Sequence, residues 1–199
     1  MLKLYSPKAA ERIIARCAPR IDDISSRFAL PAACLKAILY QEITNIDLFD
    51  LLVDRLVRRN QRRGVSGPGR LRKTDSSTGY AQIFAFVAIN AVNFAADRGL
   101  TDYAALSLPA DHRLDPASLS DIRLVWTRLN GDVDFNLTAA ALNLLSAAEE
   151  KTGRIDFPGY SPDELKRIFT RYNGTVPHIT PYGEAVYAHY LRYAGGEAR

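Results

Sequence analysis

Apolar residues recur every three or four positions along most of the chain, which is the spacing that predicts amphipathic helices. Periodic segments of this kind cover nine stretches: 7–18, 20–28, 31–43, 46–63, 83–98, 116–130, 134–152, 162–173 and 181–194. No stretch shows the clear alternation that is typical of a half-buried strand. The pattern therefore predicts a mainly α-helical protein, with a small irregular or β-hairpin loop region near 65–82.

Residues that start and stop helices support these boundaries. A potential capping side chain stands before a proline at Ser6-Pro7, Asp115-Pro116, Ser161-Pro162 and Thr180-Pro181. Proline suits the first helical turn, where its missing N–H would have no partner, and the residue before it can cap the helix. Glycines that favour helix ends follow the periodic runs at Gly64, Gly99, Gly131, Gly153 and Gly174. We predict a single domain over 1–199 with eight or nine helices, of which the N-terminal ones occupy 1–29.

Composition narrows the class of protein without fixing its function. A chain of 199 residues that is 47% hydrophobic can form one domain with a substantial core. The formal net charge of +4 is compatible with an anionic polymer as partner, whether nucleic acid or bacterial wall. Cys17 and Cys34 lie on successive predicted helices and could pair or remain buried thiols. Because no zinc-type cysteine spacing occurs, we expect neither a metal nor a cofactor.

The pattern also bears on membranes and export. No stretch approaches the roughly 18 apolar residues of a transmembrane helix, so we expect no membrane span. Residues 1–5 lead directly into a charged helix and contain no apolar core of a signal peptide. We therefore expect no conventional export signal in these residues.

The helix predicted over 31–43 contains the first candidate for chemistry. At about 100° per residue, Glu42 falls within the apolar stripe that contains Leu35 and Leu39. An ionised carboxylate is unfavourable there, so burial should raise its pKa, as a general acid working near neutral pH requires. The alternative is a glutamate at the helix end that turns toward solvent or pairs with an arginine.

The helix predicted over 46–63 is amphipathic and leads into a basic segment. Asp47, Asp50 and Asp54 share one face and could be taken for a metal cluster, but acids near a helix N-terminus favour the helix dipole. We therefore expect them to be structural. The basic segment consists of Arg58, Arg59, Arg62, Arg63, Arg70, Arg72 and Lys73. It is either a loop that faces a sugar polymer or phosphate, or a solvated insertion.

Three further motifs follow in order. A polar stretch from Thr74 ends in Gly79-Tyr80-Ala81-Gln82-Ile83, a small-residue helix begins Phe135-Asn136-Leu137, and Tyr172-Asn173-Gly174 precedes a final tyrosine-rich helix. Together with a helix ending in Glu42, this order resembles the lysozyme-like superfamily over roughly 30–195. The most similar groups are soluble lytic transglycosylases and goose-type lysozymes. Their Gly-Leu-Met-Gln-Ile and Tyr-Asn-Gly motifs are similar to the first and last of these.

The chain also departs from the pattern of that family. Ile43 follows the glutamate where the family usually has serine, and 37 positions separate Glu42 from Gly79, which is longer than these families lead us to expect. The helix and basic loop within 45–74 would then be an insertion at the edge of the cleft.

The resemblance implies a glycosidase that cuts peptidoglycan glycan strands at the β-1,4 bond between N-acetylmuramic acid and N-acetylglucosamine. Glu42 would be the general acid, and Tyr172 would steer its carboxyl group or stabilise charge on the sugar. Gln82, with Ser76 or Ser77, would hold the N-acetyl groups. The full set of candidate substrate-binding residues is Ser76, Ser77, Gly79, Tyr80, Gln82 and Asn173.

The identity of a second acid decides the reaction. By the same resemblance, Asp75 could activate water across a gap of about 6.5–9.5 Å, giving hydrolysis, which we favour slightly. Without such a base, the muramic 6-hydroxyl could attack internally and leave an anhydro product, as in lytic transglycosylases. The alternative for Asp75 is a surface cap or an ion pair with Arg72 or Lys73.

Two other functions compete with the glycosidase. One is a basic α-helical binding module for nucleic acid or another anionic polymer, and the other is a catalytically inactive lysozyme-like scaffold. Nucleic acid is disfavoured because the basic residues lie largely in one loop and no helix-turn-helix signature occurs. The scattered His112, His178 and His189 lack an accompanying nucleophile motif. A wall enzyme would act in the periplasm or outside the cell, by an export route that the sequence leaves open.

Overall fold

The computed structural model describes residues 3–65 and 73–196. Over these residues the chain forms eight α-helices and no strand, which confirms the mainly α-helical class. The helices are α1 (Pro7–Phe28), α2 (Ala32–Asn45), α3 (Leu48–Arg63), α4 (Ala85–Asp97), α5 (Leu119–Gly131), α6 (Val133–Thr152), α7 (Pro162–Asn173) and α8 (Pro181–Gly196). A 3₁₀ turn, η2 (Phe157–Gly159), precedes α7.

The helices predicted over 7–18 and 20–28 form one continuous helix, α1. Pro19 lies inside α1, where it removes one backbone hydrogen bond and normally kinks or breaks a helix. Buried side chains continue on both sides of it, from Ile14 and Cys17 to Ile21 and Ile24. Packing of this continuous apolar face holds the helix together across the proline, which the local rule does not take into account.

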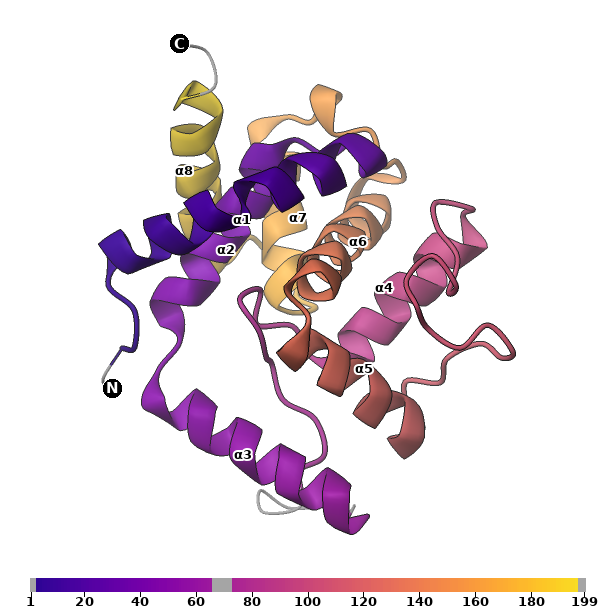
Figure 1. Ribbon diagram of the computed structural model, residues 1–199. Helices are drawn as coiled ribbons and strands as arrows, with labels where there is room; N and C mark the ends of the chain where they lie inside the picture. Colours follow the sequence, from indigo (N-terminus) through magenta and orange to yellow (C-terminus); the bar gives the residue numbers. More distant parts are fainter. Residues whose placement is uncertain (1–2, 66–72, 197–199) are drawn as a thin grey trace.

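Helix α6 is the core of the fold. Its side chains are buried from Phe135 to Leu145, and it contacts α1, α2, α4, α5 and α7. Figure 1 shows these neighbouring helices gathered around it. Small residues such as Ala139 and Ala140 allow the neighbouring helices to approach closely, and a helix that is apolar all round has to be buried.

Helix α3 lies at the edge of the molecule, apart from the main bundle (Figure 1). Its inner face is attached to the segment that follows the basic loop. The side-chain amides of Asn60 and Gln61 donate to the carbonyl oxygens of Lys73 and Thr74 at 2.9 and 2.7 Å. Its N-terminus is closed by a capping box, in which Asp47 and Asp50 each accept a backbone N–H of the other.

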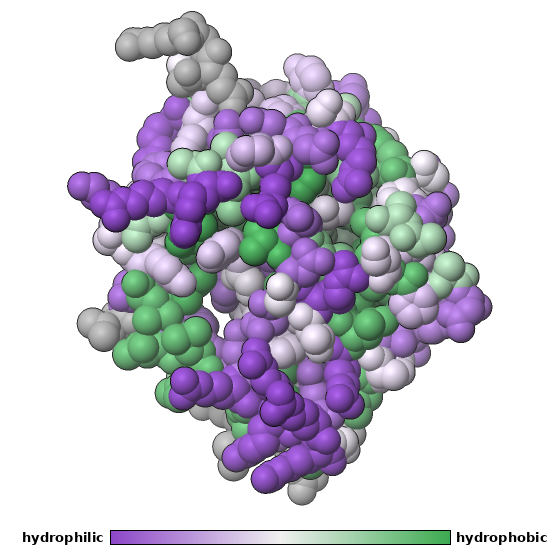
Figure 2. All heavy atoms as spheres, viewed as in Figure 1, coloured by the Kyte–Doolittle hydropathy of each residue, from purple (hydrophilic) through white to green (hydrophobic). Residues whose placement is uncertain are grey.

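The outer face of α3 carries two kinds of side chain. Leu48, Phe49, Leu51 and Leu52 are exposed in its first turns, and arginines follow in its last turns. Figure 2 shows hydrophobic and strongly hydrophilic surface side by side along this edge. Of the predicted basic segment, Arg70 and Arg72 lie outside the described residues.

Two smaller expectations can also be compared with the structure. Cys17 and Cys34 are both buried, and no disulfide joins them in the described part of the chain. Among the described residues, no helix is long and apolar enough to cross a bilayer.

Candidate active site

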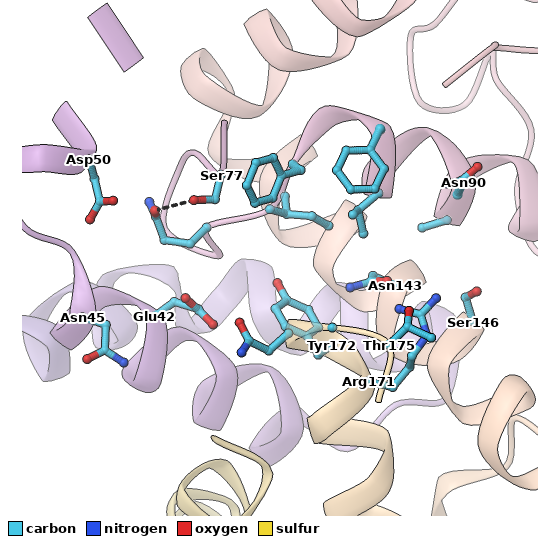
Figure 3. A pocket seen from close by; sticks show the side chains of 18 of the residues that line it. Glu42, Asn45, Asp50, Ser77, Asn90, Asn143, Ser146, Arg171, Tyr172 and Thr175 are labelled. Carbon is cyan, nitrogen blue, oxygen red and sulfur yellow. Dashed lines mark hydrogen bonds between the residues drawn. The ribbon is translucent and has the colours of Figure 1, made fainter. Parts of the chain in front are cut away.

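A cleft of about 500 Å³ runs between two walls of the molecule. One wall comes from the end of α2, the middle of α6 and the end of α7, and the other from the segment 77–91 and the start of α3 (Figure 3). Its polar lining comprises Glu42, Asn45, Asp50, Ser77, Gln82, Asn90, Asn143, Ser146, Arg171, Tyr172, Asn173 and Thr175.

Glu42 lies in the last turn of α2, where the buried Leu39 and Ile43 anchor the helix in the core. Burial raises the pKa of its carboxyl group to about 7. A hydrogen bond from the Tyr182 hydroxyl opposes this rise, and the charge of Asp50 adds to it. The apolar environment expected for Glu42 is therefore found, whereas its catalytic role is still a prediction.

Two tyrosines from late in the chain surround this carboxyl group. Tyr172, at the end of α7, is 8% exposed, and its hydroxyl donates to the carbonyl of Ala81 at 2.8 Å. Tyr182, in the first turn of α8, donates its hydroxyl hydrogen to Glu42 Oε1. Burial, and then the nearby charge of Glu42, raises the pKa of both phenols well above the usual range, so both keep their protons.

Tyr182 was not predicted as a site residue. Its only signal in the sequence is its position in the tyrosine-rich helix that follows Tyr172-Asn173-Gly174. The contact with Glu42 joins residues 140 positions apart, so it depends on how α8 packs against α2.

The Gly79–Ile83 motif forms a tight turn. Thr78 and Ile83 form an isolated antiparallel bridge, and no strand forms in the described part of the region near 65–82 that was expected to be irregular or a β-hairpin. The Asn136 side chain on α6 binds this turn: its Oδ1 accepts the Ala81 N–H at 2.9 Å, and its Nδ2 donates to the Thr78 carbonyl at 3.1 Å. The motif is thereby fixed to the central helix of the core.

Gln82 adopts a left-handed conformation with φ of 44°, which is unusual for a residue with a side chain. Its Nε2 donates to the Gly79 carbonyl at 2.7 Å, and its Oε1 accepts from Ser77 at 3.3 Å. These two contacts hold the Gln82 amide at the wall of the cleft, where Figure 3 marks the second of them by a dashed line.

The structure brings together only part of the predicted site. Ser77, Gln82 and Asn173 line the cleft with Glu42 and Tyr172. Gly79 and Tyr80 line an adjoining hollow of about 260 Å³. Ser76 is buried, where its hydroxyl donates to Asp54 at 2.7 Å and accepts from the Trp126 indole at 3.0 Å. Ser76 is therefore part of the packing beneath α3.

Asp75 caps helix α4. Its two carboxylate oxygens accept the backbone N–H groups of Ala85 and Phe86, each at 3.0 Å. Burial raises the pKa of Asp75, and these hydrogen bonds oppose the rise. Asp75 is not among the residues that line the cleft, so within the described residues its observed role is the cap that the sequence left open as an alternative.

Replacing Asp75 by alanine should therefore destabilise the fold. We expect urea unfolding to show a loss of about 1–2 kcal/mol, because two N–H groups of the first turn of α4 lose their acceptor. Asp75→Asn retains one acceptor and should lose less. If Asp75 acts only as a cap, the asparagine variant keeps any activity of the folded protein. Loss of activity in a variant that is still folded would instead indicate a catalytic role for Asp75.

Several lining residues were not predicted at all. The rings of Phe84 and Phe86 are 37% and 44% exposed, with centroids 5.6 Å apart, and both residues line the cleft. Asn143 on α6 is 4% exposed, and its Nδ2 has no hydrogen-bond partner among the described residues. The sequence placed all three in helices of the core, and only the packing of α4 against α6 brings them to the cleft.

The hydrogen bond from Tyr182 allows a test of the environment of Glu42. Tyr182→Phe removes a donor that stabilises the ionised carboxylate, so the pKa of Glu42 should rise above its value of about 7. Titration of ¹³C-labelled glutamate by NMR measures this shift directly. Tyr187→Phe, on the same helix, serves as the control and should leave the titration unchanged; an equal midpoint in both variants would contradict the contact.

Searches against known protein families, curated proteins and solved structures found no match to this chain. The described residues contain no group of three or more His, Cys, Asp or Glu side chains that could hold a metal ion. What they do provide is one carboxyl group of raised pKa in a cleft lined by amides, hydroxyls and two phenyl rings.

Proposed function

We propose that the protein is a peptidoglycan β-1,4-glycosidase with Glu42 as its general acid. The observation that carries this proposal is the carboxyl group of Glu42, which has a pKa of about 7 and lines the cleft between the two walls. A protonated carboxyl group at neutral pH can donate its hydrogen to the glycosidic oxygen as the C–O bond breaks. Tyr182 would keep this group oriented, because its phenol stays protonated and donates to Glu42. Tyr172 lines the cleft as well and donates instead to the Ala81 carbonyl, so it would act by its position beside the bound sugar.

The lining supports a sugar polymer as substrate. The amides of Asn45, Gln82 and Asn143 can donate to and accept from hydroxyl and N-acetyl groups. The exposed rings of Phe84 and Phe86 offer apolar faces to the C–H side of a sugar ring. A site for small or polymeric ligands commonly combines such apolar surfaces with a few placed polar groups. By this proposal, the protein would act at the bacterial cell wall.

Digestion of purified peptidoglycan tests the proposal. The protein is incubated with sacculi of several chemotypes at pH 6, and soluble muropeptides are separated and identified by mass spectrometry. Release of disaccharide-peptides with muramic acid at the new end supports the proposal. If no chemotype yields soluble fragments, the glycosidase function is wrong.

The arginines of helix α3 support a second candidate function, the binding of an anionic polymer. Five arginines line a shallow hollow on its last turns: Arg55, Arg58, Arg59, Arg62 and Arg63. Arg58 donates to Asn130 at 2.6 Å, and none of the five forms an ion pair with an acid among the described residues. Binding of a polyanion that weakens steeply with salt would support this function, and wall digestion would be absent.

A further inference from the structure

Asp50 lines the same cleft as Glu42 from the opposite wall. Asp50 comes from the first turn of α3 and Glu42 from the last turn of α2, and Figure 3 shows the two side chains on opposite sides of the open space beside Ser77. They are the two carboxylic acids among the described residues that line this cleft.

One oxygen of Asp50 is free for chemistry. Its Oδ2 accepts the backbone N–H of Asp47 at 2.9 Å in the capping box. Its Oδ1 has no hydrogen-bond partner within the part of the chain that the structure describes. The capping box therefore fixes the orientation of the Asp50 carboxyl group and leaves one oxygen available.

The other acids near the cleft are already engaged. Both oxygens of Asp75 accept N–H groups of α4. Both oxygens of Asp54 accept hydrogen bonds, from Ser76 at 2.7 Å and from Thr78 at 2.9 Å, and Asp54 lines the adjoining hollow instead of the main cleft. Neither can accept a proton from water in the cleft without giving up contacts that hold the fold together.

Resting on the glycosidase function proposed above, we infer that Asp50 is the general base of an inverting hydrolysis. Water held between the Asp50 carboxylate and the sugar attacks the anomeric carbon, and Asp50 takes a proton from that water. Glu42 gives its proton to the glycosidic oxygen, so the bond to the leaving sugar breaks and the leaving group departs as a neutral alcohol. Exchange with solvent then restores both carboxyl groups.

The arrangement of the two acids fits this division of roles. In an inverting enzyme the two carboxyl groups flank the scissile bond about 6.5–9.5 Å apart, which leaves room for a water molecule. Glu42 and Asp50 lie on opposite walls of the cleft, as such flanking requires. Burial is the main cause of the raised pKa of Glu42, and the charge of Asp50 adds a smaller contribution in the same direction, which helps Glu42 keep its proton. The base would thus come from the helix that, by the resemblance to lysozyme-like proteins, is an insertion within 45–74.

The test compares Asp50→Asn with wild type and with Asp47→Asn. Asparagine at position 50 can still accept the Asp47 N–H, so the capping box is retained. Asp47 is the N-cap of the same helix and is not among the residues that line the cleft, which makes its asparagine variant a matched control. We expect wild type and Asp47→Asn to produce reducing ends with inverted anomeric configuration, seen by NMR early in the reaction.

For Asp50→Asn we expect turnover to fall by about 10²–10⁴-fold with little change in KM, as for loss of a general base. Azide should restore turnover in Asp50→Ala by forming an α-glycosyl azide, which a purely structural role for Asp50 would not produce. Undiminished turnover in Asp50→Asn, or 1,6-anhydro ends from wild type, would overturn the assignment of Asp50 while leaving the glycosidase intact. Absence of any cleavage by wild type would overturn both.

Discussion

Glu42→Gln is expected to reduce peptidoglycan cleavage by at least ~10³-fold, because an amide cannot donate the proton that the leaving oxygen needs. The change preserves the contact with Tyr182, since the glutamine carbonyl oxygen accepts the same hydroxyl hydrogen. Release of soluble muropeptides measures the effect. Undiminished release by a folded Glu42→Gln protein would remove Glu42 from the mechanism.

The same variant should gain stability at alkaline pH. The pKa of Glu42 is raised from 4.5 to about 7 in the folded protein, so wild type loses stability as pH rises between these two values. Below pH 4.5 the two proteins should be alike in this respect. Above pH 7 we expect Glu42→Gln to be more stable by about 2 kcal/mol, somewhat less than the full shift implies, because the side chain partly faces the cleft.

Urea unfolding at pH 5 and pH 8 separates this effect from a general change in the fold. Glu184→Gln is a suitable control, since Glu184 is exposed and pairs only with Lys166 at 3.0 Å among the described residues. It should change neither the wall cleavage nor the dependence of stability on pH. Equal stability of Glu42→Gln and wild type at pH 8 would mean that Glu42 is ionised in the folded protein without cost.

Features that depend on one helix were predictable from the sequence. The placement of Glu42 in an apolar stripe follows from its spacing to Leu35 and Leu39 along α2, and the structure has the raised pKa that this spacing implies. Pro19 shows the limit of local rules, because burial on both sides of it overrides its tendency to end a helix. The mainly α-helical class and most helix ends could be predicted from the sequence for the same reason, because they depend on local patterns.

Features that depend on how helices meet were not predictable. Asp50 was expected to serve the helix dipole, and its capping role is present, but its place in the cleft depends on how α3 folds back toward α2. Asp75 was placed near Glu42 by analogy, whereas its oxygens bind the start of α4 ten and eleven positions later. Without the tertiary arrangement, no spacing rule distinguishes these two aspartates.

The turn that contains Gln82 depends on both local sequence and helix packing. Its motif is a short run of residues, but the side chain that holds it comes from a distant helix. The Asn136 amide, more than fifty positions away, binds the Thr78 carbonyl at the start of the turn and the Ala81 N–H within it. The Gly79–Ile83 turn therefore needs Asn136 of α6 to hold Gln82 at the cleft wall.

Gly79→Ala should consequently be among the most damaging single substitutions in the protein. A Cβ at this position would lie 2.2 Å from Asn136 Nδ2 and 2.7 Å from the Leu129 carbonyl oxygen, at a φ of +72° that alanine tolerates poorly. Relieving these clashes requires Asn136 to give up its contacts with the turn. We expect a loss of about 3–5 kcal/mol in the free energy of unfolding, measured in urea.

Gly99→Ala separates the clash from the backbone strain. Gly99 has a similar φ of +66°, but a Cβ there would meet no atom within 4 Å. It should therefore lose only about 1–2 kcal/mol, the cost of a left-handed conformation. The difference between the two variants measures how strongly close contact with Asn136 restricts position 79, and equal losses would show that backbone conformation alone requires glycine there.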